Sequence, residues 1–411
     1  MIRDLRKALL ELKPTPEDDG VFSNAIDTVT QWLWQLNLVP RNHRLIHRVT
    51  DLESHSILGS LTPLVESPEV LLPLFQAGTG TAALLGLLLP LLPAVSAMET
   101  KQRFIVIVDE PELHLHPGFH GVIADLIRGL PHQSIIVTHS PHAARSIPAE
   151  DIVVIQRSLE GKLHAEPLVP RSTGTSERVV RVLYHKSRDE LLSAILGQAV
   201  VVPEGETDSM WLTRVASLAR LYQSAGSLPP NTAPVLAAVE VLPTPNSQVT
   251  QVCQELLRLG SRILPIIDGD EGGTSKLDDL GKVGVGRVVQ WPTRWGIESV
   301  IAWICQPALT SNDAQQFLCR TLARSVDSVK ALREALIALK NDWALISSFL
   351  FNLITSVGDS PHDVIRRAYA LWHDLSALAL GTSPHDKLLL QWSTDQLPTL
   401  TVLRPAISYA P

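Results

Sequence analysis

Five acidic residues in the second half of the chain follow apolar runs, a placement that suits a divalent-metal site. Glu204 ends the run AVVVPE, and Asp208 follows it about one helical turn later. Asp268 and Asp270 end the run ILPIIDGD, and Glu298 follows the run GRVVQ within WPTRWGIES. If the three runs are neighbouring parallel strands, the five carboxylates meet at one edge of a sheet.

Such a cluster of carboxylates requires cations, because like charges at close range repel one another and raise one another's pKa values. Mg²⁺ and Mn²⁺ prefer oxygen ligands, and two such ions can activate a water and stabilise the leaving oxygen of a phosphodiester. Taken singly, EGETD is also an ordinary helix start and IIDGDEGG an ordinary turn. Their joint occurrence, followed by IES, favours in-line hydrolysis of DNA with two Mg²⁺ or Mn²⁺ ions.

The first half of the chain carries residues suited to nucleotide phosphates. In FIVIVDEPELHLHP, Asp109 could hold Mg²⁺ and Glu110 could orient the attacking water, and in SIIVTHSPH His139 could sense a γ-phosphate. The small residues Gly78, Thr79, Gly80 and Thr81 precede an apolar run, where free backbone N–H groups suit an anion. Alternatively, DEPE ends a surface strand and the histidines are incidental; His114 and His116, without a third ligand, are interpreted as structural.

The apolar runs predict an α/β fold in which strands alternate with helices. The first group has strands at Phe104–Val108, expected to be buried, at Ser134–Val137 and at Asp151–Ile155, with a helix over 119–130. The second has strands at Ala199–Val202, Val235–Val241, Arg262–Ile267 and Gly286–Gln290, with helices over 207–223, 247–259 and 297–305.

These motifs resemble the OLD (overcoming lysogenisation defect) family of nucleases, including the nuclease–ATPase of Gabija antiphage defence, over residues 76–305. The resemblance implies an ABC-type ATPase of the RecF and SMC lineage, with a signature motif at Gly78–Thr81, a Walker B motif at Phe104–Glu110, a D-loop at Leu113–Pro117 and a switch histidine at His139. VVVPEGETD, IIDGD and WPTRWGIES resemble a Toprim domain. This implies metal ligation by Glu204, Asp208, Asp268, Asp270 and Glu298, with Glu204 also a candidate base.

The expected fold is an incomplete ABC-type ATPase sheet, then a Toprim (Rossmann-like) parallel sheet, then a helical tail. The predicted parts are a helical segment over 1–75, the C-terminal part of the ATPase over 76–170, a helical connector over 171–197, the Toprim nuclease domain over 198–305 and a helical region over 306–411.

The chain departs from the family pattern in its nucleotide site. It has no G-x-x-x-x-G-K-[ST] motif, and the nearest candidate, Ile57–Ser60, lacks the lysine. The expectation is that the chain begins inside the ATPase, without the phosphate cradle and the strand-rich lobe. It would then not hydrolyse ATP alone and would use ATP only in trans or with a partner. Pro203 departs from the expected residue before Glu-Gly, and the family's lysine could be Lys276 or Lys387, with Arg294 as a phosphate contact.

The composition limits which binding partners and which cellular compartment can be expected. The net charge of −7 and the three scattered cysteines, Cys253, Cys305 and Cys319, favour a cytoplasmic chain with reduced thiols and no broad basic surface. The apolar run Ala82–Met98 is interrupted by prolines and is predicted to be a core helix rather than a membrane span. The expected partners are DNA, a second copy of the chain, and a subunit that supplies a P-loop or a helicase, with no membrane.

Other functions stay open at this point. The chain could be a catalytically inactive, ATPase-like regulatory subunit with vestigial carboxylates, or the truncated product of a longer gene. A topoisomerase or primase is disfavoured, because the four tyrosines lack the context of a nucleophile and no zinc-binding cysteine pairs occur. Antiphage defence is the biological setting that the family resemblance implies.

Overall fold

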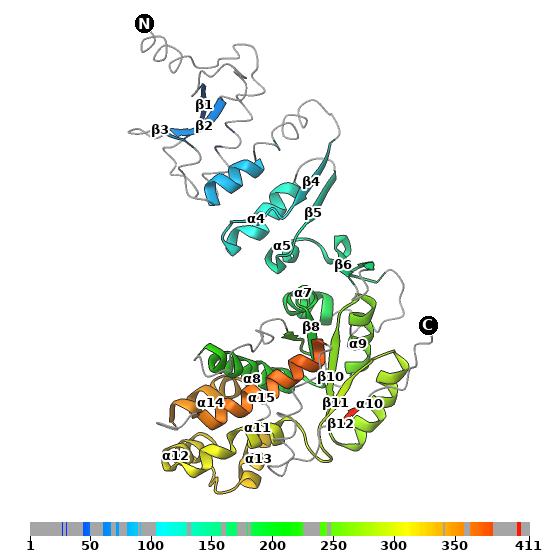
Figure 1. Cartoon of the computed structure of the whole chain (residues 1–411), viewed down its shortest axis with the longest axis vertical. Helices are drawn as coiled ribbons and strands as arrows, with labels where there is room; N and C mark the ends of the chain where they lie inside the picture. The colour runs from blue at the N-terminus through cyan, green and yellow to red at the C-terminus, as the bar shows by residue number, and fades with distance from the viewer. Residues whose placement is uncertain are drawn as a thin grey trace. The chain divides into compact units, whose positions relative to one another are not determined.

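The computed structural model divides the chain into two compact units, Met1–Pro148 and Ala149–Pro411 (Figure 1). The structure describes 44–49, 61–66, 71–73, 80–88, 104–129, 133–157, 162–170, 182–224, 239–244, 248–339, 342–356, 362–380 and 401–403, with residues 27, 30, 91 and 179.

The first unit contains a small antiparallel sheet in a region that the sequence pattern predicts to be helical. β1 (Arg44–Val49) pairs with β2 (Leu61–Glu66), which pairs with β3 (Leu71–Pro73). The prediction of a mostly helical segment over 1–75 was therefore wrong for these residues. The apolar runs there are short and broken by proline, so they show neither the helical period of 3.6 residues nor the strand period of 2 residues.

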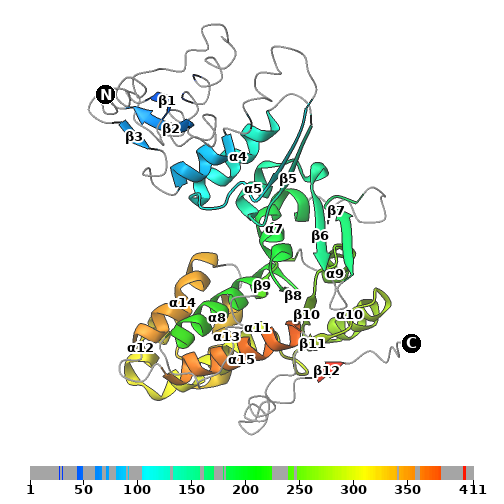
Figure 2. The ribbon, with the colours of Figure 1, turned by 45° about the horizontal axis from the view of Figure 1, so that its top comes forward.

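A pair of parallel strands in the same unit carries the predicted nucleotide residues. β4 (Ile105–Asp109) lies beside β5 (Gln133–Val137) (Figure 2). The helices α4 (Pro117–Arg128) and α5 (Pro141–Ser146) follow these two strands, and α4 buries Ile123, Ala124 and Ile127. Both strands were predicted, but burial of β4 was not confirmed, because Ile105 and Ile107 are 63% and 69% exposed. The apolar run specifies the strand, while exposure depends on what covers each face.

Residues 80–88 form a helix with Leu84, Leu85 and Leu88 buried, as a core helix requires. This range covers the first part of the predicted apolar helix at Ala82–Met98. In the part of the chain that the structure describes, no helix has the length and apolar character needed to cross a membrane.

The second unit is built on a five-stranded sheet in the order β12-β11-β10-β8-β9. The first four strands along the chain are parallel to one another, and β12 runs antiparallel to β11. All five residues of β8 are buried, which agrees with a central strand covered on both faces. The strands are β8 (Ala199–Pro203), β9 (Val239–Val241), β10 (Ile263–Ile267), β11 (Val288–Gln290) and β12 (Thr401–Leu403).

Helices cover both faces of this sheet, as Figure 1 shows for α9 and α10 on one side and α8 and α15 on the other. The helices that follow the strands are α8 (Glu206–Ser224), α9 (Val249–Arg258), α10 (Glu271–Lys282) and α11 (Ile297–Cys305). Among them, the helices over 207–223, 247–259 and 297–305 were predicted from sequence, whereas α10 was not. The apolar periodicity of each run therefore identified three of these helices within a few residues of their ends.

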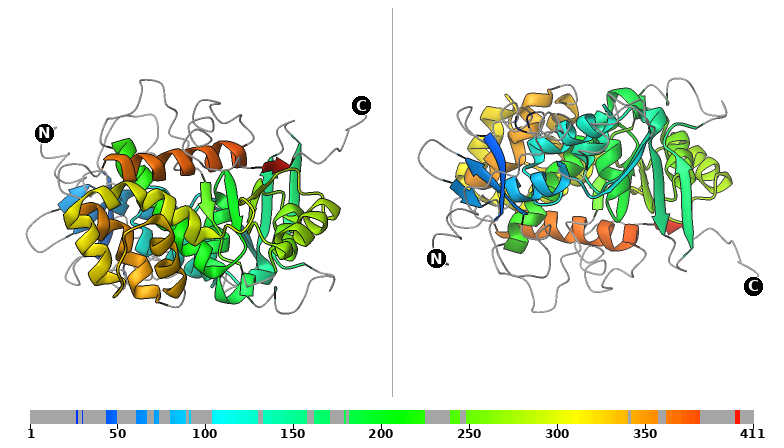
Figure 3. Two further views of the ribbon diagram at one scale, coloured as in Figure 1. Left: turned by 90° about the horizontal axis from the view of Figure 1, so that it is seen from below. Right: turned by 90° about the horizontal axis from the view of Figure 1, so that it is seen from above.

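The region predicted to be a helical tail packs against the sheet rather than extending away from it. α15 lies along α8 (Figure 3), and Trp211 of α8 meets Phe349 edge to face with ring centroids 5.8 Å apart. Trp211, Phe349 and Trp372 are all fully buried. The helical prediction for 306–411 is confirmed for these helices but was wrong for β12. The elements are η5 (Gln306–Thr310), α12 (Asn312–Thr321), α13 (Val329–Ala338), α14 (Trp343–Ser356) and α15 (His362–Leu380).

The connecting region begins with the turn η2 (Ala149–Asp151) and a hairpin of β6 (Val153–Arg157) and β7 (Leu163–Pro167). A π-helical turn, η3 (Val182–Lys186), and α7 (Arg188–Leu196) follow, which confirms the helical connector over those residues. The hairpin belongs to the second compact unit, although the predicted ATPase part ran to residue 170.

Candidate functional site

The strand order of the second unit creates a ligand-binding position beyond the ends of β8 and β10. The chain runs from β8 to β9 on one side and then returns past β8 to β10 and β11 on the other. The loops that leave β8 and β10 therefore diverge in opposite directions, and α/β proteins bind ligands at such a point. Glu204 directly follows β8, and Asp268 directly follows β10.

Glu204 is held across this gap by contacts to the loop after β10 and to α10. Its Oε2 accepts a hydrogen bond from the backbone N–H of Asp268 at 3.0 Å. Its Oε1 forms an ion pair with the ammonium of Lys276, and the two side chains are only 17% and 22% exposed. The carboxylate of Glu204 is thus fixed between the ends of β8 and β10 and is mostly shielded from solvent.

Asp268 and Glu298 come together beside Gly296, the residue that precedes α11. A Cβ atom placed on Gly296 would lie 3.2 Å from Oε2 of Glu298 and 3.4 and 3.5 Å from the two carboxylate oxygens of Asp268. Both carboxylates therefore lie close to one point, and a side chain at residue 296 would require them to shift slightly. Glu204 contacts the same loop through the backbone of Asp268, so the three predicted residues lie near the same strand ends.

The other two predicted ligands are arranged differently. Asp270 is the N-cap of α10, and its Oδ1 accepts a hydrogen bond from the N–H of Gly273 at 2.6 Å. The side chain is exposed and serves the helix start, as acidic residues often do. Asp208 lies half-buried in the first turn of α8, which starts two residues after Glu204.

Backbone hydrogen bonds of Gly269 join the loop after Asp268 to the segment that precedes Glu298. The N–H of Gly269 donates to the carbonyl of Trp295 at 2.9 Å, and the N–H of Arg294 donates to the carbonyl of Gly269 at 2.7 Å. A Cβ on Gly269 would lie 1.8 Å from the carbonyl oxygen of Pro292. Only glycine permits this close approach of the two backbones.

Replacing Gly269 by alanine should therefore destabilise the protein by about 3 kcal/mol, since the added methyl forces the two loops apart. Chemical denaturation followed by circular dichroism measures the change. Gly281→Ala is the matched control, because no atom lies within 4 Å of a Cβ there and the residue is in α10. Alanine at that helical position should stabilise by up to about 1 kcal/mol. Equal stability of the two variants would contradict this close approach.

The donor set at this edge fits a divalent cation in its chemistry, because carboxylate oxygens are the preferred ligands of Mg²⁺ and Mn²⁺. However, the described ranges contain no group of three or more Asp, Glu, His or Cys side chains that could hold a metal ion. In this structure Oε1 of Glu204 is paired with Lys276 instead.

The predicted nucleotide residues of the first unit are also partly assembled. The N–H of Glu110 donates to the carbonyl of Val137 at 2.8 Å, so β4 and β5 end together. Nε2 of His139 lies 3.7 Å from Oε1 of Glu110, and both side chains are accessible at 79% and 44%. Glu110 has a φ of +46°, a conformation that costs energy for a residue with a Cβ and is common at functional sites. Asp109 is exposed at the tip of β4.

Glu112 fixes this pair and was not identified from sequence. Its Oε1 accepts hydrogen bonds from Oγ1 of Thr138 at 2.6 Å and from the N–H of His139 at 3.0 Å. The glutamate two residues after Glu110 thus holds the backbone of His139 in place. No local sequence pattern predicts this contact of Glu112, because it joins residues that follow two separate strands.

The proposed signature residues fall partly outside the described residues. Gly78 and Thr79 are not described, whereas Gly80 and Thr81 lie at the start of the helix over 80–88. A Cβ on Gly80 would lie 3.3 Å from the carbonyl oxygen of His114, so the helix start lies against the predicted D-loop. His116 is structural, as predicted, because its Nδ1 accepts a hydrogen bond from the N–H of Gly118 and caps α4.

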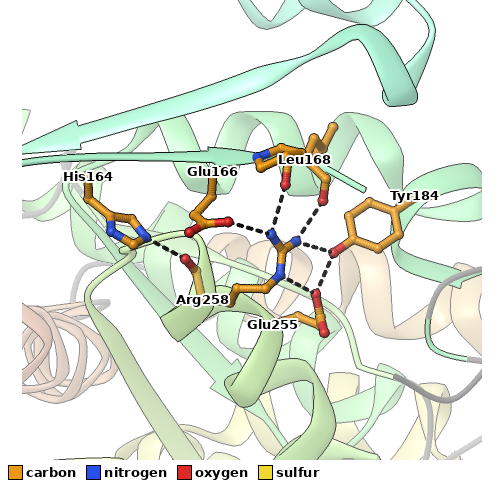
Figure 4. Close-up of polar contacts among 7 residues, drawn as sticks. His164, Glu166, Leu168, Tyr184, Glu255 and Arg258 are labelled. Atoms are coloured by element: carbon orange, nitrogen blue, oxygen red, sulfur yellow. Dashed lines mark hydrogen bonds and ion pairs between the residues drawn. The ribbon is translucent and has the colours of Figure 1, made fainter. Parts of the chain in front are cut away.

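Arg258, the last residue of α9, centres a buried polar cluster that fixes the β6–β7 hairpin to the second unit (Figure 4). Its guanidinium donates to the carbonyls of Pro167 and Leu168, both at 2.8 Å. It also donates to Glu255 at 3.0 Å and to the hydroxyl of Tyr184 at 3.2 Å. Burial, followed by the charge of Glu255, raises the pKa of Tyr184, so the phenol stays protonated and donates to Glu255 at 2.8 Å.

The cysteines take no part in either site. Burial raises the pKa of the thiols of Cys253 and Cys305, which makes them poor nucleophiles and poor metal ligands at neutral pH. Cys319 is half-buried, and all three cysteines are free thiols, as the scattered positions predict.

Comparison with known families bears on the first unit. A family model described as "AAA domain, putative AbiEii toxin, Type IV TA system" matches residues 12–145. Residues 12–145 are therefore similar to an AAA-type ATPase domain. This ATPase-like domain contains Asp109 and His139, and its matched range starts well before residue 76, where the sequence motifs placed the boundary.

The chain also has a weak structural neighbour. A solved structure described as "Structural biochemistry of ATP-driven dimerization and DNA stimulated activation of SMC ATPases" shares 16% identity, with a TM-score of 0.27, over 37% of this chain and 90% of that chain. A similarity of this size adds no detail to the ATPase-like domain. No curated protein matches the chain.

Proposed function

We propose that the second unit is a metal-dependent DNA nuclease of the Toprim type, and that the ATPase-like domain regulates it, as in the OLD family. The observation that carries the proposal is the convergence of Glu204, Asp268 and Glu298 beyond the ends of two neighbouring parallel strands. The strand order around β8 and β10 supports the same interpretation, because it opens a binding position at the carboxylates.

In this proposal each residue of the chain has a distinct role. Glu204, Asp268 and Glu298 would hold Mg²⁺ or Mn²⁺, with Asp208 and Asp270 completing the ligand set. When bound, the ions would supply an activated water and charge stabilisation for phosphodiester hydrolysis. Glu204 would also accept a proton, and the hydrogen bond from the N–H of Asp268, which fixes its carboxylate, supports this role. Arg294, exposed and held at a φ of +66° by the loop before α11, would bind a DNA phosphate.

The ATPase-like domain is proposed to bind ATP only with a second polypeptide. Glu110 and His139 lie together at the ends of two strands, where they could act on a γ-phosphate. The chain sequence contains no G-x-x-x-x-G-K-[ST] motif, so the phosphate cradle would come from a different subunit. A homodimer and a role in antiphage defence belong to the same proposal.

A plasmid-nicking assay tests the nuclease. The intact chain should convert supercoiled plasmid to nicked or linear DNA with Mg²⁺ or Mn²⁺, and EDTA should stop the reaction. Asp268→Ala should abolish cleavage, while Asp279→Asn, an exposed carboxylate of α10 paired with Lys282, should cleave at the normal rate. An absence of cleavage with either ion, with ATP and without it, would instead favour a non-catalytic regulatory subunit.

A further inference from the structure

His120, in the first turn of α4, connects two loops of the first unit that are separate in sequence. Its Nδ1 lies 2.8 Å from Oγ of Ser140, and its Nε2 lies 3.1 Å from the carbonyl oxygen of Leu115. Ser140 directly follows His139 and is only 6% exposed. The imidazole of His120 therefore links the loop after β5 to the predicted D-loop.

The partners of this imidazole fix which of its nitrogens carries hydrogen. A carbonyl oxygen only accepts, so Nε2 must donate to Leu115. In the neutral ring Nδ1 then has no hydrogen, and it accepts from the hydroxyl of Ser140. The same hydroxyl oxygen accepts from the N–H of Ala143 at 3.2 Å and so caps α5. A polar network in which each member has its partner favours one rigid arrangement.

A second connection reaches His139 from the same loop. Glu112 accepts hydrogen bonds from Thr138 and from the N–H of His139, and Oγ1 of Thr138 accepts from the N–H of Ser140 at 2.9 Å. Glu112 and Leu115 belong to one short segment, in which the N–H of Leu115 donates to the carbonyl of Glu112 at 3.0 Å. The backbone on both sides of His139 is thus attached to this segment.

The middle of the segment is accessible to another polypeptide. Leu113 is 55% exposed, and His114 is exposed and has a φ of +65°. These two residues lie between Glu112 and Leu115, which carry the two connections. A displacement of the exposed middle therefore moves both connections together.

We infer that His120 is a positioning residue for His139, and that it transmits a displacement of the predicted D-loop to His139 through Ser140. The imidazole of His139 is 79% exposed, so its backbone rather than side-chain packing sets its position. The inference rests on the proposed ATP site, in which a different subunit approaches this domain and His139 acts on the γ-phosphate. It assigns the regulation of that site to a contact with the D-loop.

Hydrogen exchange of the full-length chain, resolved to single amides by NMR, tests this inference without nucleotide. In His120→Ala the N–H groups of His139 and Leu115 should exchange about fivefold to tenfold faster, because hydrogen bonds that hold their loops are lost. The N–H of Glu110, which joins the ends of β4 and β5, should exchange as in the wild type. His142→Ala is the matched control, since the exposed His142 meets the His120 ring only edge-on, with centroids 6.2 Å apart.

Two conservative variants separate hydrogen bonding from packing. The amide of His120→Gln offers an acceptor to Ser140 and a donor to Leu115, so exchange should return to within about twofold of the wild type. His120→Asn is too short to reach both partners and should leave the N–H of Leu115 in fast exchange. If His120→Ala does not fold, these two variants carry the test.

A change in the exposed middle of the segment measures the transmission itself. Leu113→Arg should shift the backbone amide resonance of His139, and adding His120→Ala should reduce this shift to about half, because one of the two connections remains. Equal shifts in both backgrounds, or no shift in either, would overturn the inference. So would wild-type exchange in His120→Ala, or a glutamine variant that restores nothing.

The proposed ATP site is tested separately from this coupling. Failure of the chain to bind ATP, alone or with a second subunit, would contradict that site. The exchange rates and the amide shifts would stand, because none of them requires nucleotide. Uncoupled loops in a chain that does bind ATP with a second subunit would sink the role of His120 alone.

Discussion

Glu204→Gln should slow metal-dependent DNA cleavage roughly a hundredfold to ten-thousandfold, the range typical of losing a positioned base. The amide keeps the shape of the side chain and can still accept the hydrogen bond from the N–H of Asp268. It cannot accept a proton, and it is a much poorer ligand for Mg²⁺ or Mn²⁺ than a carboxylate. The effect should therefore fall on cleavage and metal binding rather than on the fold.

Single-turnover cleavage of supercoiled plasmid measures the rate, and thermal melting followed by circular dichroism verifies the fold. Glu206→Gln is a close control, because Glu206 lies two residues away but pairs with Lys186 on the surface at 3.2 Å. That variant should cleave within about twofold of the wild type, since exposed pairs contribute little. Cleavage by Glu204→Gln at the wild-type rate would mean that the chemistry occurs elsewhere in the chain.

The central part of this site was predictable from sequence because buried parallel strands leave a strong local signal. The runs before Glu204 and Asp268 are short, apolar and bounded by glycine, which predicts strands whose ends share one sheet edge. The strands that end before Glu204 and Asp268 were predicted in this way and lie side by side in parallel, and the carboxylates of Asp268 and Glu298 both lie beside Gly296. That these residues form one site stays a prediction. The metal and the reaction stay predictions, since no contact of the chain alone tests them.

The remaining features depend on contacts that no local pattern encodes. Two examples are the hydrogen bond by which Asp270 caps α10 and the ion pair of Lys276 with Glu204. Both form only after the loop and the helix have folded. β12 is three residues long and pairs with β11, more than a hundred residues earlier, so its apolar run TVL has no helical or strand period to detect. β1, β2 and β3 were not predicted for a similar reason, because they are also short and show no clear strand period.

Arg258→Ala should lower the free energy of unfolding of the second unit by about 3–5 kcal/mol, the usual cost of removing one partner from a buried ion pair. The variant leaves Glu255, which is 4% exposed, without the cation 3.0 Å away. It also removes the donors to the carbonyls of Pro167 and Leu168, which hold the β6–β7 hairpin. Arg258→Lys should recover less than half, because an ammonium cannot reach two carbonyls, a carboxylate and a phenol in one plane.

Urea denaturation measures these losses, and Arg366→Ala is the control, because Arg366 pairs with Asp363 on an exposed helix face and should change stability by less than about 0.5 kcal/mol. Hydrogen exchange adds a local readout: amides of the hairpin over 153–167 should lose protection in Arg258→Ala before those of β8 and β10. The hairpin directly follows the ATPase-like domain in the sequence, and Arg258 lies only a few residues before β10, the strand that precedes Asp268. A variant as stable as the wild type, with a protected hairpin, would show that apolar packing alone holds this connection.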